Sequence, residues 1–338
     1  MKNKGEKELI LDKIVAEKRK RVEERKRVVS LEEIKGQAQA LVEGTEENRF
    51  KNALKKPGLS VIGEYKKASP SKGLILPDFN VEEIEKLYRE LGIDAFSVLT
   101  EEDFFQGSDE NLKKVKALSN TPILRKDFII DFYQIYEAKV LGASGILLIV
   151  AELKEKLKEF YDECVKFKLE PLIEVHNKEE LDIALEAGGE IIGINNRNLK
   201  TFVTTLDITK DLIEYVPKDK VIVSESGMHT VEDLRKIKAM GADAVLVGEM
   251  FMRNIKNEEF KEEFKCVGDV RSIGLFSAVE LVKDKKTKEA LVPYGKDPEG
   301  IMGKIIGMLK AKGFMTYSHE NMIFVSPPLI ITEEQLLE

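Results

Sequence analysis

The chain has 338 residues, of which 43% are hydrophobic and 34% are charged, and its formal net charge is -7. This length supplies enough apolar material for one large domain or two ordinary ones. The mild acidity argues against non-specific nucleic-acid binding, which requires a basic surface. The two cysteines, Cys164 and Cys266, give neither a metal-ligand spacing nor a disulfide framework. No apolar run reaches the ~20 residues of a membrane span, and the first ten residues lack a signal-peptide core, so we expect a soluble, cytoplasmic protein.

The first predicted element runs from about Leu9 to Ile34 and is a charged helical extension with apolar positions at helical spacing. Basic residues cluster at positions 18–21, but Glu23 and Glu24 interrupt the positive charge one residue later. This mixture of signs favours a solvated helix face over a nucleic-acid contact.

From residue 60 onward, short apolar runs alternate with amphipathic helices, which indicates parallel strands covered by helices. Several helices end in a glycine, a common left-handed cap before a strand: Gly92, Gly142, Gly188 and Gly241. The strand-like runs cover residues 59–66, 95–100, 122–129, 145–150, 171–176, 191–198, 221–227 and 244–250. Eight such units within about 200 residues fit an α/β closed (β/α)8 TIM barrel. An open doubly wound sheet is the alternative, but the first run is not followed by its Gly-rich phosphate turn.

Polar residues gather where these runs end, which is where a (β/α)8 barrel performs its chemistry. A charge inside an apolar strand is costly unless it is paired or functional. Glu64 and Lys66 are two residues apart, so their side chains lie on the same side of the first strand; a structural salt bridge is the alternative interpretation. The other run ends carry Lys126, Glu174, His176, Asn195, Asn196, Arg197, Glu225, Ser226 and Glu249.

The turns after the last two strands predict a phosphate site. Backbone N–H groups near Gly227 and Gly248, close to helix starts, suit an anion, and barrels of this kind often bind phosphate there. Ser69 and Arg197 can add a hydroxyl and a guanidinium to the same anion. The pattern alone predicts an enzyme that acts on a phosphorylated small molecule by acid–base chemistry. A sugar-phosphate isomerase and a catalytically inactive scaffold are the alternatives.

Seven motifs over about residues 8–255 resemble those of indole-3-glycerol-phosphate synthases: LDKIVAEKRKRVEERK, VIGEYKKASPSKGLI, LRKDFIID, PLIEVH, IGINNRNL, VSESGM and VLVGEMFMR. The resemblance implies a carboxy-lyase of tryptophan biosynthesis that works without cofactor or metal. Such an enzyme closes the indole ring of 1-(2-carboxyphenylamino)-1-deoxyribulose 5-phosphate and releases CO2 and water. The implied partner is therefore this phosphorylated, anthranilate-derived small molecule, with no nucleic acid or membrane; association with other enzymes of the pathway stays open.

The resemblance also implies roles for single residues. Lys126 matches the general acid that protonates the substrate carbonyl as the ring closes. Lys66 matches the lysine that pairs with the substrate carboxylate and assists dehydration, and Glu64 matches a glutamate implicated in proton removal. Glu174 matches the residue that orients the lysines, and Asn195 the one that holds the substrate hydroxyls. The remaining matches are the strand-end pair Glu225 and Ser226, the phosphate contacts Ser69, Arg197, Gly227, Gly248 and Glu249, and the apolar walls Phe128 and Leu199.

Three expectations concern neighbours of these residues. Lysines crowded in a half-dry pocket should have lowered pKa values, opposed by Glu64 and Glu174. We expect His176 to cap or pack at the end of its strand rather than act as a base. Asn196 and Asn198 are expected to be tolerated variation beside Arg197.

Residues 263–338 continue beyond the barrel-sized domain of residues 1–262 and form a small, partial α+β segment by their pattern. We expect strands at 273–282, 314–319 and 322–329, a helix at 300–313, and a helix start at Thr332. The stretches GDVRSIGLFSAVELV and IFVSPPLIITEEQL resemble the C-terminal small domain of class III pyridoxal-phosphate aminotransferases. That family's large domain and Schiff-base lysine are absent, so the resemblance implies a non-catalytic appendage, from a fusion or a gene-model join.

Overall fold

The computed structural model describes residues 10–56, 58–198, 203–257, 260, 267–273, 276–284, 287, 289–292, 296–297, 300–311, 316–320 and 322–325. By its internal contacts the chain divides into two compact units, Met1–Ile255 and Lys256–Glu338. Leu199, Cys266 and the helix start expected at Thr332 lie outside the described residues.

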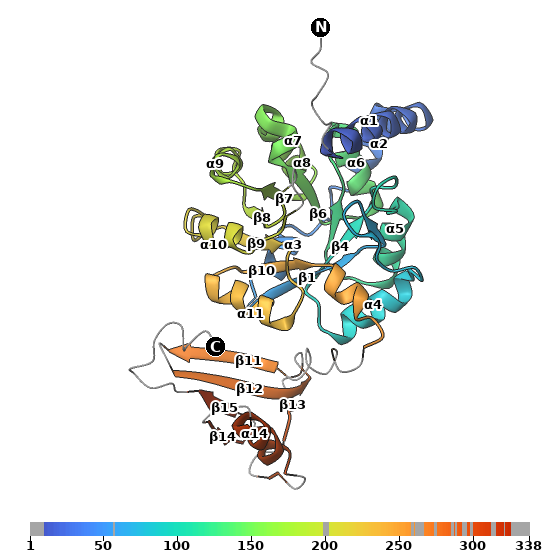
Figure 1. Ribbon diagram of the computed structural model, residues 1–338. Coiled ribbons are helices and arrows are strands. Elements are labelled where there is room, and N and C mark those ends of the chain that lie inside the picture. Colours follow the sequence, from blue (N-terminus) through green and yellow to red (C-terminus); the bar gives the residue numbers. More distant parts are fainter. Residues whose placement is uncertain are drawn as a thin grey trace. The chain divides into compact units, whose positions relative to one another are not determined.

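The first unit contains a closed barrel of eight parallel strands. Its strands are β1 (Ser60–Tyr65), β4 (Ala95–Leu99), β5 (Ile123–Lys126), β6 (Gly145–Ile149), β7 (Glu170–Val175), β8 (Ile191–Asn195), β9 (Val221–Glu225) and β10 (Ala244–Val247). The order around the barrel is β1-β10-β9-β8-β7-β6-β5-β4, with β4 pairing back to β1 (Figure 1). Each strand overlaps one of the eight expected runs. The (β/α)8 prediction is therefore confirmed, and the open doubly wound alternative is wrong.

Helices connect successive strands and cover the outside of the barrel (Figure 1). They are α4 (Val81–Glu90), α5 (Asp109–Leu118), α6 (Phe132–Leu141), α7 (Val150–Leu153), α8 (Leu157–Lys166), α9 (Lys178–Glu186), α10 (Asp207–Ile213), α11 (Val231–Met240) and α12 (Glu249–Arg253). The four glycines expected as helix caps have φ angles between 70° and 101°, the left-handed conformation that glycine adopts at least cost. None of the helices in the described ranges is long and apolar enough to cross a membrane.

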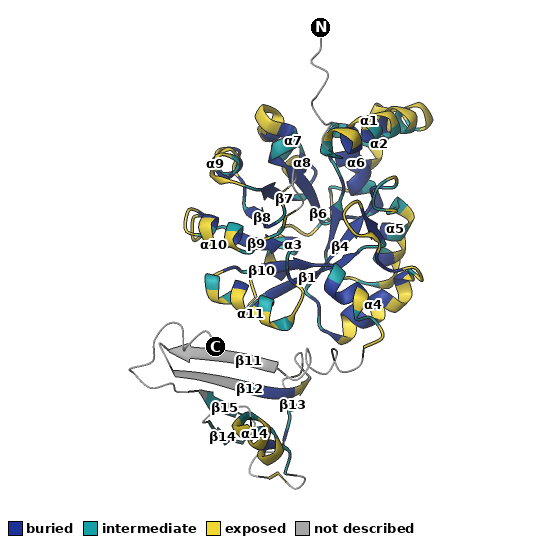
Figure 2. Cartoon of the chain, viewed as in Figure 1, coloured by how far each residue is buried: buried dark blue, intermediate teal, exposed yellow. Residues whose placement is uncertain are grey.

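The barrel interior is packed with apolar side chains. Its strands are almost entirely buried (Figure 2); the exceptions are Lys126 at the end of β5 and Glu170 at the start of β7, which are partly exposed. One cluster joins residues of the strands, such as Leu124, Leu172 and Val223, to Phe50 and Leu54 of α3 (Arg49–Leu54). The short α3 thus closes the end of the barrel where the strands begin, which leaves the opposite end for ligands.

The N-terminal extension forms two helices, α1 (Ile10–Val28) and α2 (Leu31–Ala40), rather than one. The break occurs at Ser30, whose hydroxyl accepts a hydrogen bond from the backbone N–H of Glu33 at 3.2 Å and so begins a new helix. Ile34 and Ala38 of α2 pack with Tyr133 and Tyr136 of α6, which attaches the extension to the barrel wall.

Lys18 of α1 contradicts the expectation of a solvated basic face. Its Nζ lies 2.8 Å from Oδ1 of Asp127, and the two side chains are only 4% and 0% exposed. Asp127 also accepts a hydrogen bond from the Thr100 hydroxyl at 2.7 Å. Burial alone would raise the pKa of Asp127, but Lys18 and Arg125 hold it below its usual value. A buried ion pair therefore fastens α1 to the end of β5, one residue from Lys126.

We expect Lys18→Ala to lower the free energy of unfolding of the barrel by about 3 kcal/mol, because it leaves a buried carboxylate without its nearest cation. Urea unfolding followed by circular dichroism measures the change. Lys20→Ala is the matched control in the same helix, since Lys20 pairs with Glu17 at the exposed surface and its loss should change stability little. Equal, small effects of both substitutions would contradict a structural role for the buried pair.

The second unit contains an antiparallel sheet of β11 (Val267–Ile273), β12 (Phe276–Asp284), β13 (Glu289–Ala290), β14 (Tyr317–His319) and β15 (Met322–Val325). The strand order is β11-β12-β15-β14, and β13 pairs with β12. Residues of α14 (Ile301–Ala311), among them Met302, pack with Leu281 and Ile323 of the sheet. This α+β arrangement matches the expected class. The expected strand at 273–282 is corrected in one respect: β12 is preceded by β11, an additional strand that pairs with it.

Candidate active site

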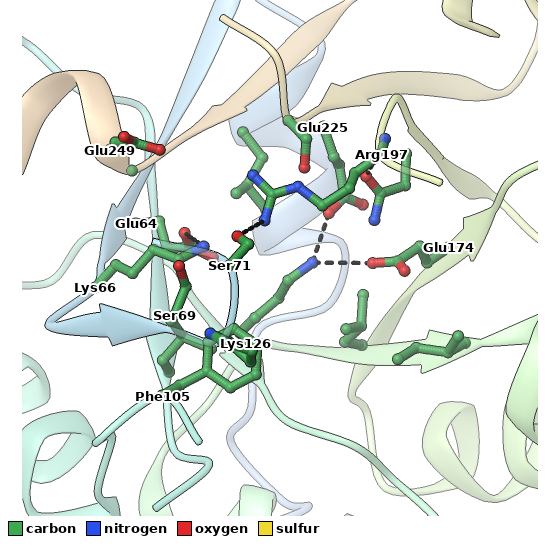
Figure 3. A pocket seen from close by; sticks show the side chains of 18 of the residues that line it. Glu64, Lys66, Ser69, Ser71, Phe105, Lys126, Glu174, Arg197, Glu225 and Glu249 are labelled. Atoms are coloured by element: carbon green, nitrogen blue, oxygen red, sulfur yellow. Dashed lines mark hydrogen bonds and ion pairs between the residues drawn. The ribbon is translucent and has the colours of Figure 1, made fainter. Parts of the chain in front are cut away.

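The carboxyl ends of the barrel strands surround a cavity of about 150 Å³. Figure 3 shows the charged side chains converging there from several strands. Of the residues predicted for the site, every one that lies within the described ranges lines this cavity: Glu64, Lys66, Ser69, Lys126, Phe128, Glu174, Asn195, Arg197, Glu225, Ser226, Gly227, Gly248 and Glu249. Residues that are up to 185 positions apart in sequence (from Glu64 to Glu249) therefore meet in one place because parallel strands carry them to the same end.

Lys126, the last residue of β5, lies between two carboxylates. Its Nζ is 2.5 Å from Oε2 of Glu225 and 3.2 Å from Oε2 of Glu174 (Figure 3). Burial alone would lower the pKa of Lys126, but Glu225, Glu174 and Glu64 together raise it well above its usual value. The expectation of a lowered lysine pKa is therefore wrong for Lys126, because the sequence did not show how closely the carboxylates approach this amine.

Glu225 is the carboxyl group of the site that titrates near neutrality. Burial raises its pKa, Lys126 lowers it and the negative charge of Glu174 raises it, with a result of about 7. Its Oε1 is buried and has no hydrogen-bond partner among the described residues. Gly193 of β8 leaves the space for this oxygen, since a Cβ at that position would lie 2.2 Å from it. A carboxyl with this pKa can either hold or release a proton at physiological pH.

Glu174 has the opposite character, because it contacts two cations. His176 Nε2 lies 3.3 Å from Oε1 of Glu174, and His176 Nδ1 lies 3.0 Å from Glu180. Burial would lower the pKa of His176, but the two glutamates raise it to about 10. Burial would raise the pKa of Glu174, yet Lys126 and His176 hold it well below its usual range. His176 is therefore already protonated at neutral pH and unable to accept a further proton, while Glu174 stays ionised. The two carboxylates that contact Lys126 thus differ in protonation: Glu174 stays ionised, whereas Glu225 titrates near neutral pH.

Glu64 and Lys66 form a second charged pair at the end of β1. The Lys66 Nζ is 3.0 Å from Oε2 of Glu64, and the side chains are 17% and 4% exposed. The pair faces the cavity rather than the outer surface. Gly248 at the end of β10 makes room for it, because a Cβ there would lie 2.5 Å from Oε2 of Glu64. Phe105 contributes a ring whose centroid is 5.7 Å from the Lys66 Nζ.

The cavity also contains hydrogen-bond donors suited to an anion. Ser226 and Gly227 follow β9 with φ angles of 65° and 88°, a turn that exposes consecutive backbone N–H groups. Arg197 reaches across from the end of β8 and donates from Nη1 to the Ser71 hydroxyl at 3.1 Å, while its buried Nε has no partner among the described residues. Ser69 lies in β2 (Ala68–Ser69), which pairs with β3 (Gly73–Leu74) in the loop after β1.

The structure corrects the interpretation of Asn196. This side chain is completely buried, and its Oδ1 accepts hydrogen bonds from both the backbone N–H and the hydroxyl of Thr209 at 3.1 and 2.9 Å. Its Nδ2 donates to Ser224 at 2.9 Å. Asn196 therefore fixes the turn that positions Asn195 and Arg197, and is not tolerated variation. The sequence signal that could have indicated this structural role is an amide side chain close to the end of an apolar strand.

Several cavity residues carried no recognisable signal in the sequence. The cavity is also lined by Ile10, Leu11, Ile14, Ser71 and Phe105, from α1 and from loops. Ordinary apolar residues of a helix do not indicate which surface they face. Within the described ranges, no group of three His, Cys, Asp or Glu side chains is arranged to hold a metal ion.

We expect one glutamate carboxyl of the ligand-free protein to titrate near pH 7, since the pKa of Glu225 is about 7. NMR of protein labelled with 13C at the glutamate side-chain carboxyl should show a resonance that shifts through this pH and is absent from Glu225→Gln. Because folding raises this pKa, the group contributes most to stability below its unfolded value, 4.5, and the contribution is lost as pH rises through 7. Glu23→Gln, at an exposed position, is the control. A spectrum with no carboxyl titrating above about pH 6 would contradict the burial of this charge.

Comparison with known proteins identifies the family. A family model described as Indole-3-glycerol phosphate synthase matches residues 11–264. A protein of that name from Thermoanaerobacter pseudethanolicus is 49% identical over 264 residues, which cover 77% of this chain and 100% of the relative. Counterparts from Clostridium acetobutylicum and Alkaliphilus metalliredigens are 48% and 50% identical over 256 and 248 residues, covering 76% and 72% of this chain and 97% and 94% of their own. The chain therefore belongs to the indole-3-glycerol phosphate synthase family, carboxy-lyases of tryptophan biosynthesis that act on a small phosphorylated substrate.

Proposed function

We propose specific roles for the cavity residues in this family's reaction, the ring closure of 1-(2-carboxyphenylamino)-1-deoxyribulose 5-phosphate with loss of CO2 and water. The observation that carries the proposal is the convergence of two lysines, each in contact with carboxylates, on one cavity. Family membership argues against a sugar-phosphate isomerase. The paired side chains of Lys66 and Lys126 argue against a catalytically inactive scaffold.

Lys126 acts as the general acid of ring closure. The carbon of the aromatic ring that bears the carboxylate attacks the substrate carbonyl, a C–C bond forms, and the carbonyl oxygen takes a proton from the Lys126 ammonium. The raised pKa of Lys126 supports this role because the amine is protonated before the reaction begins. Glu174 remains ionised and stabilises the positive charge that develops on the anilino nitrogen of the substrate during ring closure.

Lys66 and Glu64 serve the later steps. The Lys66 ammonium pairs with the substrate carboxylate until CO2 leaves, and then protonates the departing hydroxyl as water is lost. Glu64, 3.0 Å from Lys66, accepts the proton that the new indole ring releases. Glu225 contacts Lys126 directly and has a pKa of about 7, so it can return a proton to that lysine between turnovers.

The remaining residues bind the two ends of the substrate. The phosphate is held by Arg197, Ser69 and the backbone at Gly227 and Gly248. Asn195 holds the substrate hydroxyls, and Ser226 adds a hydrogen-bonding group beside Glu225. Glu249 contributes its backbone N–H, since its carboxylate pairs with Arg253 at 2.8 Å. Phe128, with Leu199, forms the apolar wall for the anthranilate ring. Holding both ends supports the reaction because the attacking carbon and the carbonyl must meet in a fixed orientation.

We also propose that the barrel domain spans residues 1–262 and that residues 263–338 are a non-catalytic appendage related to class III aminotransferases. The two stretches that resemble that family support the relation, and the absence of its Schiff-base lysine supports the lack of activity. The protein works in the cytoplasm on a small molecule, without cofactor, nucleic acid or membrane.

Lys126→Ala and Lys66→Ala should each lower kcat by about two to four orders of magnitude, because each removes a proton donor or an ionic contact to the reacting groups. Indole fluorescence in a steady-state assay measures turnover, and circular dichroism checks the fold. Lys113→Ala is the control, since Lys113 pairs with Glu110 on the exposed face of α5. Turnover unchanged in both cavity variants would refute the assigned roles.

A chain stopped after residue 262 should turn over at the rate of the full-length protein, because every residue of the described cavity precedes position 250. The comparison needs kcat and KM of both proteins under identical conditions. A large loss of kcat in a shortened protein that still folds would show that the appendage takes part in catalysis.

A further inference from the structure

A second cavity, of about 430 Å³, lies at the end of the barrel where the strands begin. It adjoins Ser144 and Glu170, which stand at the starts of β6 and β7, and it is bounded by the connection between α2 and α3. Its volume is within the range of small-molecule sites. The catalytic cavity lies at the opposite, carboxyl ends of the strands, so this is a separate site.

Four cationic side chains line the second cavity: Arg49, Lys116, Lys139 and Lys168. This local excess of positive charge occurs in a chain whose formal net charge is -7. Bringing like charges together is unfavourable, and this contributes to the lowered pKa values of two of the lysines. Burial and the charge of Arg49 lower the pKa of Lys116, and burial and the charge of Lys168 lower the pKa of Lys139.

The carboxylates nearby are engaged elsewhere or exposed. Glu170 accepts hydrogen bonds from the backbone N–H groups of Phe50 and Lys51 at 2.8 and 2.7 Å, so it caps α3. Glu47 lies 3.1 Å from the Nζ of Lys168 and balances that charge. Glu46 lies at the exposed edge of the cavity. Arg49, Lys116 and Lys139 form no ion pair with any carboxylate in the described part of the chain.

Lys139 is the decisive residue, because it is only 4% exposed. Its Nζ donates to the Thr45 hydroxyl at 2.8 Å, a neutral partner. A buried ammonium without a counter-ion is strongly unfavourable, and a bound anion would remove that penalty. Several amines and a guanidinium directed at one hollow suit an oxyanion with more than one negative charge.

We propose that this cavity binds an anion of the phosphate class, either free phosphate or a phosphate monoester, at a site remote from catalysis. The anion bridges Lys139 and Lys116 of the barrel wall to Arg49, and so fastens the α2–α3 connection to the barrel. Thr45 holds the Lys139 ammonium at this site, since its hydroxyl accepts a hydrogen bond from Lys139 at 2.8 Å and donates one to the backbone carbonyl of Leu41 at 2.6 Å.

Isothermal titration calorimetry with inorganic phosphate, and separately with ribose 5-phosphate, tests the proposal in chloride buffers of matched ionic strength. We expect a binding event in the wild type that Lys139→Met abolishes and Lys116→Met weakens at least tenfold. Lys113→Met is the control, because Lys113 lies on the same helix as Lys116 but pairs with Glu110 at the surface. If both ligands bind, free phosphate is sufficient for recognition. If only ribose 5-phosphate binds, the site requires a phosphate monoester.

Phosphate that enters the catalytic cavity is distinguished by kinetics. Phosphate that competes with substrate should have the same inhibition constant in the wild type and in Lys139→Met, while only the wild type shows the additional binding site by calorimetry.

Thermal unfolding gives a second readout. Without phosphate, Lys139→Met should be at least as stable as the wild type, since it removes an unpaired buried charge. Addition of phosphate should raise the Tm of the wild type by more than it raises the Tm of Lys139→Met. If neither ligand binds outside the catalytic cavity, or Lys139→Met lowers the Tm equally with and without phosphate, the proposal is overturned.

Discussion

The buried contact of Lys126 with Glu174 and Glu225 is the interaction on which the site depends. One ammonium lies between two carboxylates at 3.2 and 2.5 Å, and the side chains of Lys126, Glu174 and Glu225 are only 14%, 5% and 2% exposed. One positive charge cannot neutralise two buried negative charges, so one carboxyl must take up a proton readily or gain another cation. Both solutions are present: Glu225 has a pKa of about 7, and Glu174 gains a second cation in His176. The protonation states needed for acid–base chemistry thus follow from the charge balance of the cavity.

The two chain neighbours of Lys126 belong to a second system of buried charges. Arg125 precedes Lys126, so its side chain points away from the cavity, where it is fully buried and lies 2.6 Å from Glu137. Asp127 follows Lys126 and is paired with Lys18 of α1. The reacting lysine is therefore held between two residues that are themselves fixed by buried ion pairs. This explains how an apolar barrel can present an ammonium in a defined position, since fixing neighbours on rigid elements limits the freedom of the group between them.

Much of the fold was predictable because its signals are local and repeated. Eight apolar runs, glycine caps and polar strand ends recur at regular spacing, and closing the barrel places those ends together without further information. Contacts between distant segments were not predictable in this way. The sequence marks positions 18–21 as basic, and Lys18 stands at helical spacing from the apolar Ile14 and Val22. It does not show that the carboxylate of Asp127 meets Lys18 on this face, because that contact joins segments more than 100 residues apart. The raised pKa of Lys126 was missed for the same reason: its sign depends on distances to Glu174 and Glu225, which lie 48 and 99 residues away along the chain.

A crystal structure of the protein with an unreactive analogue of its substrate, in which a hydroxyl replaces the carbonyl, tests the central claim most directly. The account predicts that this hydroxyl oxygen lies within about 3.2 Å of the Lys126 Nζ, with the analogue's carboxylate beside Lys66 and its phosphate at the Gly227 turn. An analogue bound with its reacting carbon away from both lysines, or outside the ring of strand ends, would contradict it.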